Sequence, residues 1–299
     1  MLIINLYNEI KIKLIDDEIY SKIKDYSRER HRVETYYEVG KLLSKAGRHY
    51  GDDIIGKYSE KLMVEIGKKF NKRTLFRMRQ FYEIFSNKKV SPLGTQLTWS
   101  HYRTLLSIKD ENKINYYINQ VNKRNMTKRE LENAIKSKEY ERLPEETKNK
   151  LVENKEPKVQ DLIKNPIIIN NKSNYEIINE KILQRIILED IPSFLKELGN
   201  GFTFIDNEYK IKIGNTYNYI DLLLYNIKYK CHVVIELKVA QLKKEHIGQI
   251  QVYMNYIDKN IRTINEDKTI GIIICKKDNR FIMEYCSDKR ILSKEYQIV

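Results

Sequence analysis

The spacing of apolar residues changes midway through this 299-residue chain, and the change constrains the fold more than any other feature. Up to residue 143, apolar side chains recur every three or four residues, as in Leu62, Ile66 and Phe70, which is the period of an amphipathic helix. Beyond residue 173 come short runs rich in β-branched and aromatic residues, GFTFID, EYKIKIG, YIDLLLY and CHVVIEL, which predict strands. We therefore expect two domains, an all-α domain over 1–143 and an α/β domain over 173–299.

Residues 144–172 between these domains are predicted to form a linker. The segment is polar and contains Pro144, Pro157 and Pro166, as expected of a connector. Lys181 to Leu198 is predicted to be helical, with a kink or break at Pro192. A second helix is predicted over 243–258 and a further strand over 269–275, so the order after the linker is helix, three or four strands, helix, strand.

The net charge of +14 is unevenly distributed along the chain. Residues 1–150 contain 32 basic and 21 acidic residues, a difference of +11, whereas the remainder has 23 against 20, or +3. Such asymmetry indicates that one part of the chain holds a polyanion while another does something else.

Several classes of protein are excluded by composition. No apolar run approaches the roughly 18 residues of a spanning helix, and the mean hydropathy is −0.60, so no membrane association is expected. The N-terminus lacks a signal-peptide pattern, which favours a cytoplasmic protein. Cys231, Cys275 and Cys286 form no CxxC pair, which makes a disulfide scaffold or structural zinc unexpected.

The basic residues of the N-terminal half gather in two clusters. The first comprises the basic residues within 67–80, and the second comprises Lys123, Arg124, Lys128 and Arg129. Helices predicted over 59–70 and 73–85, with a short turn between them, resemble a helix-turn-helix. Arg73 and Arg77 are four residues apart and share one helix face, while Thr127 and Glu130 mark a capping box at the second cluster. We expect Trp99 to be a core residue and His101 a hydrogen-bonded structural one. The residues predicted to bind nucleic acid are Lys68, Lys69, Lys72, Arg73, Arg77, Arg79, Lys128 and Arg129.

An ordinary solvated helix face is the alternative explanation for each of these basic clusters. Two clusters within a half that carries +11 favour nucleic-acid contact instead. Contacts to phosphates alone would account for the charge, so sequence-specific readout is not implied.

Three charged residues in the C-terminal half stand inside apolar runs. Asp221 lies in YIDLLLY, and Glu236 and Lys238 lie in CHVVIELKVA. Near-continuous apolar runs are typical of strands buried on both faces, where an ionised carboxylate is unfavourable unless it is paired, hydrogen-bonded or bound to a metal. If the two runs form a hairpin that turns near Lys228 and Tyr229, residues whose numbers sum to 457 are partners. Asp221 then lies opposite Glu236.

Two carboxylates on adjacent strands would repel each other, and a divalent cation between them removes the conflict. Mg²⁺ prefers oxygen ligands and commonly binds one or two carboxylates and a substrate phosphate. Lys238, on the same strand face as Glu236, could orient or help deprotonate a metal-bound water, or stabilise charge on the phosphate. The spacing alone is equally compatible with a purely structural ion cluster.

These residues resemble the D…(D/E)xK signature of PD-(D/E)XK nucleases, and the chain as a whole resembles the YhcG-like bacterial proteins. Those proteins join a helical N-terminal domain, which is expected to bind DNA, to a restriction-endonuclease-like nuclease domain. The similar blocks, in order, are YYEVGK, residues 58–85, LTWSHYRTLL, TKRELENAI, FLKELGNGFTF, IDLLLY, VVIELK and HIGQIQVYMNYID.

The resemblance implies that Asp221 and Glu236 bind the metal, Mg²⁺ or Mn²⁺, and that Lys238 is the catalytic lysine. It also implies that Gln249, on the helix after the ExK strand, joins the site, with Tyr253 either supporting it or simply packed. Relatives often add an acid from the first helix; here Glu180, Glu189 and Glu197 are available. Glu189 lies at the more usual distance, whereas Glu197 is expected to cap or brace its helix. The chain departs from its relatives at Leu183-Gln184, where Leu-Glu is expected.

The sequence therefore predicts an Mg²⁺-dependent DNA endonuclease whose N-terminal domain binds DNA and whose C-terminal domain hydrolyses phosphodiester bonds. The alternative is a catalytically idle nuclease fold that serves DNA binding or assembly in a restriction or mobile-element defence system. RNA is a less favoured substrate. A homodimer is expected by analogy, because a double-strand cut needs two active sites.

Overall fold

The computed structural model describes residues 2–22, 27–50, 53–86, 96–153, 155 and 158–299. The chain divides into two compact units, residues 1–140 and 141–299. The first unit contains the helices α1 (Leu2–Tyr20), α2 (Ser27–Tyr50), α3 (Asp53–Glu65), η1 (Lys68–Phe70), α4 (Lys72–Phe85), α5 (Trp99–Leu105), α6 (Glu111–Arg124) and α7 (Lys128–Lys136). The helices of the second unit are α8 (Glu145–Val152), α9 (Val159–Leu162), α10 (Glu180–Glu189), α11 (Ile191–Leu198), α12 (Lys244–Asn260) and α13 (Arg280–Glu284). Its strands are β1 (Ile167–Ile169), β2 (Phe202–Ile213), β3 (Thr216–Asn226), β4 (Cys231–Gln241), β5 (Asp267–Lys277) and β6 (Ile291–Ile298).

The first unit is helical, as the sequence predicts. The helix expected over 73–85 is α4. Its N-cap is Asn71, whose side chain accepts a hydrogen bond from the Thr74 N–H. The helix expected over 59–70 is instead the end of α3 followed by the short 3₁₀ turn η1. Gly40 allows α2 and α4 to approach closely, because a Cβ at this position would collide with the Met78 carbonyl. This contact holds α4 against the core and leaves its basic side exposed.

His101 has the structural role expected of it, whereas Trp99, expected in the core, is only partly buried and packs against the core. Trp99 packs edge-on against the rings of Tyr36 and Phe81. His101 is buried, and its Nδ1 accepts a hydrogen bond from the Thr98 N–H at 3.1 Å, which closes a capping box at the start of α5. No catalytic role is needed to explain either side chain.

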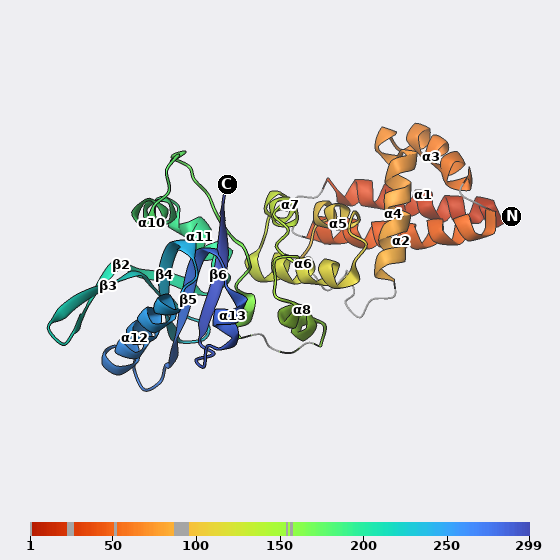
Figure 1. The fold of residues 1–299 in the computed structure, drawn as a ribbon. Coiled ribbons are helices and arrows are strands. Elements are labelled where there is room, and N and C mark those ends of the chain that lie inside the picture. The colour runs from red at the N-terminus through yellow and green to blue at the C-terminus, as the bar shows by residue number, and fades with distance from the viewer. Residues whose placement is uncertain (1, 23–26, 51–52, 87–95, 154, 156–157) are drawn as a thin grey trace. The chain divides into compact units, whose positions relative to one another are not determined.

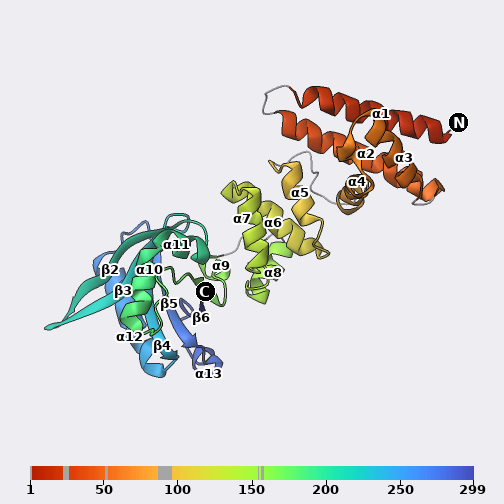
Figure 2. The ribbon, with the colours of Figure 1, turned by 90° about the horizontal axis from the view of Figure 1, so that it is seen from above.

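The second unit is built on a six-stranded mixed sheet with the order β1-β6-β5-β4-β3-β2. Strands β1, β6, β5 and β4 are parallel, whereas β3 and β2 are antiparallel to their neighbours. Helices α10 and α11 pack on one face and α12 on the other, so the sheet is buried on both faces (Figures 1 and 2). This arrangement explains the near-continuous apolar runs of β4 and β5.

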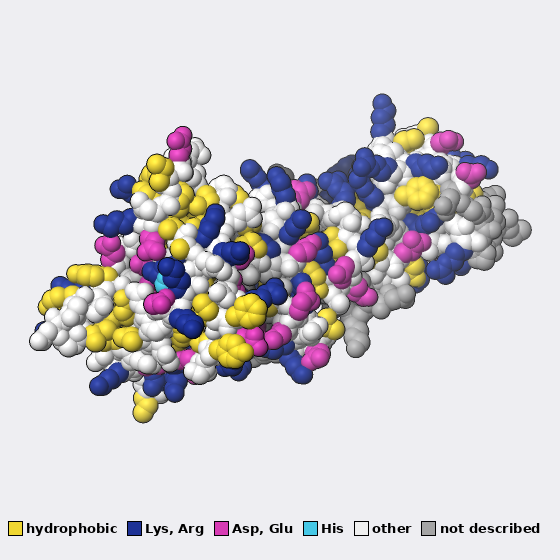
Figure 3. Space-filling model, in the orientation of Figure 1, with side chains coloured by type: hydrophobic (Ala, Val, Ile, Leu, Met, Phe, Trp, Pro, Cys, Tyr) yellow, Lys and Arg dark blue, Asp and Glu magenta, His cyan; other side chains and the backbone are white. Residues whose placement is uncertain are grey.

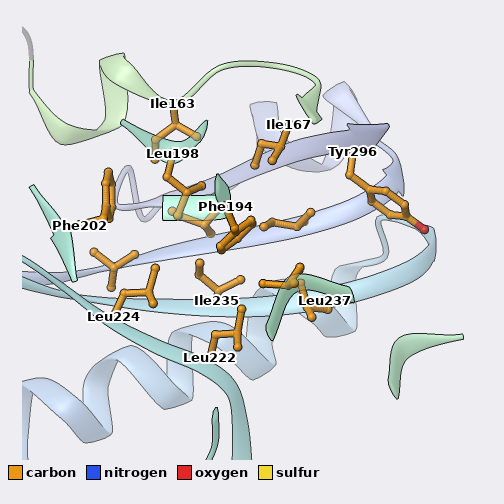
Figure 4. Packing of buried hydrophobic residues seen from close by; sticks show 14 of the residues in the cluster. Ile163, Ile167, Phe194, Leu198, Phe202, Leu222, Leu224, Ile235, Leu237 and Tyr296 are labelled. Carbon is orange, nitrogen blue, oxygen red and sulfur yellow. The ribbon is translucent and has the colours of Figure 1, made fainter. Parts of the chain in front are cut away.

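The larger of the two cores in this unit lies between the sheet and α10–α11. Phe194 and Leu198 of α11 pack against Ile235 and Leu237 of β4, among the side chains drawn in Figure 4. The break predicted at Pro192 is present, because α10 ends at Glu189 and α11 begins at Ile191. Helix α10 is thereby fixed beside the carboxyl end of β4.

The segment expected to be a linker contributes to this core. Ile163, Ile167 and Ile169 are buried, and β1 pairs with β6 at the edge of the sheet; Pro157 lies outside the described residues. Glu197 braces the segment: its carboxylate forms ion pairs with Arg142 and Lys164 and accepts a hydrogen bond from the Ile168 N–H. The polar composition of 144–172 therefore hides apolar residues that the sheet buries.

Across the described ranges, none of the helices combines the length and the apolar character needed to span a bilayer.

Candidate active site

The hairpin formed by β3 and β4 has the register predicted from the sequence. Leu222 pairs with Ile235 and Asn226 with Cys231, so partner numbers sum to 457, and the turn lies at residues 227–230. Strand β3 separates from β4 at Asp221. Its carboxylate oxygen Oδ2 instead accepts a hydrogen bond from the Leu237 N–H at 2.7 Å. Asp221 is thereby held at the point where the two strands part.

Glu236 is the most deeply buried charged residue of the site, with 1% of its surface exposed. Its Oε2 lies 3.4 Å from the Lys238 ammonium, whereas its Oε1 is buried and has no hydrogen-bond partner among the described residues. Burial and the neighbouring Asp221 carboxylate raise the pKa of Glu236 to about 8. Burial likewise raises the pKa of Asp221. Two adjacent carboxylates with raised pKa values are the electrostatic signature of a site that favours an added positive charge.

Lys238 provides part of that positive charge. Its Nζ lies 3.4 Å from Glu236 and 3.6 Å from the Glu180 carboxylate at the start of α10. Burial favours the neutral amine, but the negative charges of Glu236, Glu180 and Asp221 outweigh it and raise the pKa of Lys238. The lysine is therefore a stable cation at neutral pH.

The structure does not bring Glu189, the acid favoured from the sequence, to these residues. Its carboxylate accepts hydrogen bonds from the Ser173 and Tyr175 hydroxyls, both at 2.7 Å, and these lower its pKa. Glu180 and Glu189 stand at opposite ends of α10, roughly 13 Å apart along its axis, and the acid that reaches Lys238 is Glu180. Of these two acids, the structure therefore brings Glu180 and not Glu189 to Lys238.

Gln184 joins α10 to Asp221. Its side chain is 9% exposed, and its Nε2 donates a hydrogen bond to the Asp221 carbonyl at 2.9 Å. The departure noted at Leu183-Gln184 thus falls within the site. Within the described ranges, no three His, Cys, Asp or Glu side chains form a group able to hold a metal. The carboxylates that could bind one are the pair Asp221 and Glu236.

Helix α12 contributes three polar side chains near the pair. Gln249 donates a hydrogen bond through its Nε2 to the Tyr253 hydroxyl at 3.0 Å. Tyr253 is buried, and this burial is the main cause of its raised pKa. The negative charges of Glu236 and Asp221 raise the pKa further. Burial and the positive charge of Lys238 lower the pKa of His246. His246 is not among the site residues predicted from the sequence; its place in the first turn of α12, shortly after the ExK strand, is the signal that could have indicated it.

A cleft of about 680 Å³ runs between α10 and β2 beside this site. Gln184 and Arg185 line it from the helix, and Asn207 and Glu208 line it from the strand. Glu189 lies in the same cleft, away from Lys238. The cleft is open, polar and large enough for a segment of an extended polymer.

The basic residues predicted to bind nucleic acid lie on η1, α4 and the first turn of α7. Three of them are in ion pairs: Lys69 with Glu18, Arg79 with Glu83 and Lys128 with Glu132. The other five form no ion pair within the described part of the chain: Lys68, Lys72, Arg73, Arg77 and Arg129. In Figure 3, Lys and Arg side chains crowd the surface beside α4.

Arg103 of α5 adds a basic residue that the sequence analysis missed. Together with Arg77, Thr74 and Trp99 it lines a pocket of about 180 Å³. Burial and the neighbouring positive charges of Arg73 and Arg103 lower the pKa of Arg77. Like charges from two helices therefore meet at one pocket, an arrangement suited to an anion.

Two family models match the chain on either side of the connecting segment. Residues 160–299 match the YhcG PDDEXK nuclease domain, and residues 17–142 match the DUF1016 N-terminal domain. The chain therefore joins a part similar to the DUF1016 N-terminal domain to a part similar to the YhcG PDDEXK nuclease domain. Asp221, Glu236 and Lys238 all lie within the residues that match the nuclease-domain model. The helical unit followed by a mixed α/β unit is the architecture predicted from the sequence.

The chain is less than 25% identical to each of the three proteins described next. A protein of Escherichia coli (strain K12), named "Putative nuclease YhcG", is 23% identical over 88% of this chain and 82% of its own length. A repair endonuclease from Pyrococcus abyssi is 18% identical over 41% of this chain, with a TM-score of 0.30. An EndoMS–dsDNA complex is also 18% identical over 41% of this chain, with a TM-score of 0.31. The chain spans about half the length of these two solved structures.

Proposed function

We propose that this chain is a DNA endonuclease that depends on a divalent cation, Mg²⁺ or Mn²⁺, and whose N-terminal unit binds the substrate. The observation that carries the proposal is the buried Glu236 Oε1, which has no hydrogen-bond partner among the described residues. A buried carboxylate oxygen left in this way is unfavourable unless a cation binds it. Asp221, on the neighbouring strand, would supply the second ligand.

The donor set fits a hard cation. Both groups are carboxylates, and oxygen ligands are those that Mg²⁺ and Mn²⁺ prefer. Asp221 and Glu236 would hold the ion, with further positions left to solvent and a substrate phosphate. When bound, the ion supplies Lewis-acid stabilisation of charge on the phosphate and activates the attacking water.

Lys238 would act chiefly as a fixed positive charge. A raised pKa keeps its ammonium protonated at neutral pH, so stabilisation of the developing negative charge is favoured over proton abstraction. Glu236 and Glu180 hold the ammonium from two elements, β4 and α10. Gln184 fixes the Asp221 backbone, and the Leu237 N–H fixes its carboxylate. These contacts orient the reacting groups before the substrate arrives.

The N-terminal unit would hold DNA through its unpaired cations. Arg73 and Arg77 on α4 and Arg103 on α5 form no ion pair with the described residues. Arg77 and Arg103 line one pocket, and the charge of Arg73 acts on Arg77 beside it. A phosphate at this pocket would relieve the repulsion among the three guanidinium groups. Contacts of this kind do not depend on base sequence.

Two measurements on full-length Asp221→Asn test the proposal. Cleavage of a plasmid with Mg²⁺ should be abolished, whereas the dissociation constant for DNA should change less than about threefold. Mg²⁺ or Mn²⁺ should raise the unfolding temperature of the wild type but not of the variant. Metal-dependent cutting that survives both Asp221→Ala and Glu236→Ala would refute the site assignment.

An idle nuclease fold that serves DNA binding or assembly is the second candidate. Gln184 favours it, because this residue stands beside Asp221 where the relatives lead us to expect an acid. A wild type that binds DNA, is not stabilised by either metal and cuts no substrate would support this candidate. Gln184→Glu would then be the informative variant, since restored metal stabilisation would identify the missing ligand.

Substrate class and oligomeric state complete the proposal. DNA is preferred over RNA, and incubation with matched DNA and RNA of one sequence separates the two. A homodimer is proposed because a double-strand cut needs two active sites; the mass in solution, measured by light scattering, tests it.

A further inference from the structure

Strands β2 and β3 continue well beyond the sheet as a two-stranded ribbon. Strand β3 pairs with β4 over Leu222–Asn226, yet it pairs with β2 as far as Thr216, which lies opposite Ile213. Figures 1 and 2 both show the hairpin projecting from the sheet. The ribbon therefore begins at Asp221, the residue that would bind the cation.

The two faces of the ribbon differ. Ile211 and Ile220 are at most 1% exposed and belong to the core beneath α12. On the other face, Tyr217 and Tyr219 are 53% and 52% exposed. Burial of one face against α12 explains why the ribbon keeps its shape outside the sheet, and it leaves the second face free for a partner.

The exposed face combines these tyrosines with lysines. Lys210 pairs with Tyr219 across the ribbon, and Lys212 pairs with Tyr217. The Lys210 ammonium lies 4.0 Å from the centre of the Tyr217 ring, and the Lys212 ammonium lies 5.9 Å from it. All four side chains thus form one continuous surface of donors and aromatic rings. Hydrophobic-class side chains, which include tyrosine, are visible along the hairpin in Figure 3.

The charge of this surface is entirely positive. The outer part, residues 209–219, contains Lys210 and Lys212 and no acid. Neither lysine forms an ion pair with the described residues. Two unpaired ammonium groups beside two exposed phenols match the phosphate backbone of a nucleic acid, where lysine and tyrosine both donate to phosphate oxygens.

The surface is also close to the site. Tyr219 and Tyr217 precede Asp221 by two and four residues along β3, or roughly 7 and 13 Å at the rise of a strand. The cleft between α10 and β2 lies at the base of the ribbon and is lined there by Asn207 and Glu208. A nucleic acid that contacts the ribbon would therefore pass the carboxylate pair.

We propose that the ribbon, residues 209–219, is a contact arm for duplex DNA that positions the scissile phosphate at Asp221. A two-stranded ribbon fits the major groove, which is about 12 Å wide. Lys210, Lys212 and the two tyrosines are then positioning residues, which touch the flanking backbone and not the reacting atoms. The inference rests on the proposed nuclease function and adds the substrate form, duplex DNA, and the surface that holds it.

The test compares two double variants of the full chain. In Lys210→Ala/Lys212→Ala the arm loses both ammonium groups. Lys259→Ala/Lys268→Ala is the matched control: it removes the same charge from exposed positions at the end of α12 and the start of β5. Because β4 and β5 are parallel, the start of β5 lies at the other end of the strands from the carboxyl end of β4. For each protein, kcat and KM are measured on a duplex, and binding to the duplex and to its single strand is measured in Ca²⁺ at several salt concentrations.

The arm variant should bind the duplex about tenfold more weakly, and its salt slope should fall by about 1.8, or 0.9 for each lost phosphate contact. KM should rise while kcat stays within about twofold, and single-strand binding should change little. Tyr217→Phe removes a hydroxyl but keeps the ring beneath Lys210, and should weaken duplex binding less than the double variant. An unchanged unfolding temperature shows that all variants are folded.

Three outcomes would overturn the inference. Equal losses in the arm and control variants would mean that the lysines act only through net charge. Equal losses on duplex and single strand would mean that the arm does not recognise a groove. A fall in kcat with unchanged KM would place the arm in the chemical step and not in substrate positioning. A wild type that cuts nothing defeats the nuclease proposal, yet the binding comparison still decides whether the arm holds duplex DNA.

Discussion

The charges at the carboxyl end of β4 are buried and interact strongly with one another, whereas those on α4 and α5 are more exposed and act additively. Around β4, Glu236 is 1% exposed, and Asp221, Glu180 and Glu236 all act on one lysine, Lys238. On α4 and α5 the guanidinium groups are many, face solvent or a shallow pocket, and repel each other. The buried charges depend on one another, so the loss of one alters all the rest. The exposed charges contribute to a summed field in which each is replaceable.

This difference predicts how each region responds to conditions. Burial amplifies interactions among the β4 charges, and solution salt screens them little. The exposed arginines interact with a partner through a medium of high dielectric constant, so their effect should fall steeply with added salt. Chemistry should therefore follow pH and metal concentration, whereas DNA capture should follow ionic strength.

The largest expected effect is the loss of cleavage in Glu236→Gln. The substitution keeps the shape of the side chain but removes the negative charge that would hold a cation, and removal of one preorganised stabilising group alone costs about 10²–10³ in rate. We therefore expect single-turnover cleavage to fall by more than roughly 10³-fold. A quenched time course on labelled duplex measures it.

Glu189→Gln is the matched control for that variant. Glu189 is an acid of α10 that forms hydrogen bonds away from Lys238. The cleavage rate of Glu189→Gln should therefore stay within about threefold of the wild-type rate. Comparable losses in the two variants would break the distinction between the buried site and its surroundings, and would restore Glu189 as a site residue.

A second prediction concerns stability in the absence of metal. The pKa of Glu236 is raised to about 8 in the folded protein, so its contribution to stability is full below its ordinary value near 4.5 and is lost as pH rises towards 8. Metal-free Glu236→Gln should therefore become more stable than the wild type across this range. The advantage should reach on the order of a few kcal/mol at pH 8. Urea unfolding with EDTA at pH 5 and pH 8 measures it.

Added Mg²⁺ should reverse that order. A cation needs the ionised ligands, so its stabilisation of the wild type should grow with pH, while the variant should gain nothing. A wild type that is as stable as Glu236→Gln at pH 8 without metal would contradict the raised pKa and, with it, the claim that the pair awaits a cation.

Local patterns were sufficient to predict much of the buried site. The turn expected near Lys228 and Tyr229 gave the register that pairs Leu222 with Ile235, because the position of the turn fixes the register of a hairpin. The break between α10 and α11 followed from Pro192 in the same way. These features depend on residues close together in sequence.

Long-range packing decided what the sequence could not supply. Strand β1 has three residues and pairs with β6 more than a hundred positions away, so no local pattern distinguishes it from a linker. Strand β6 mixes Lys294 and Glu295 with apolar residues, so the local pattern predicts no strand there. The choice between Glu180 and Glu189 depends on where α10 sits relative to Lys238, and that position is a property of the packed sheet.

A third prediction sharpens the comparison from the exposed side. Arg73→Ala, Arg77→Ala and Arg103→Ala should each weaken DNA binding about three- to tenfold at low salt, and each should reduce the salt slope by about 0.9. Cleavage at saturating DNA should not change. Binding titrations between 50 and 200 mM salt, values chosen to span a strong salt response, test this. A loss in Arg103→Ala that does not depend on salt would mean that the pocket makes a specific contact.

The smallest effect is expected at Lys128, a cation on the same unit that already has a partner. Its ammonium lies 3.0 Å from Glu132, one helical turn further along α7, so DNA would have to displace an acid that remains beside it. Lys128→Ala should change affinity by less than about twofold, since an exposed pair of this kind is worth only about 0.3–0.5 kcal/mol. Glu132→Gln is the matched change: it frees the lysine and should strengthen binding slightly at low salt. If Lys128→Ala instead weakens binding as much as Arg77→Ala, then pairing within the free protein does not decide which cations capture DNA, and the basic half must be treated as a uniform field.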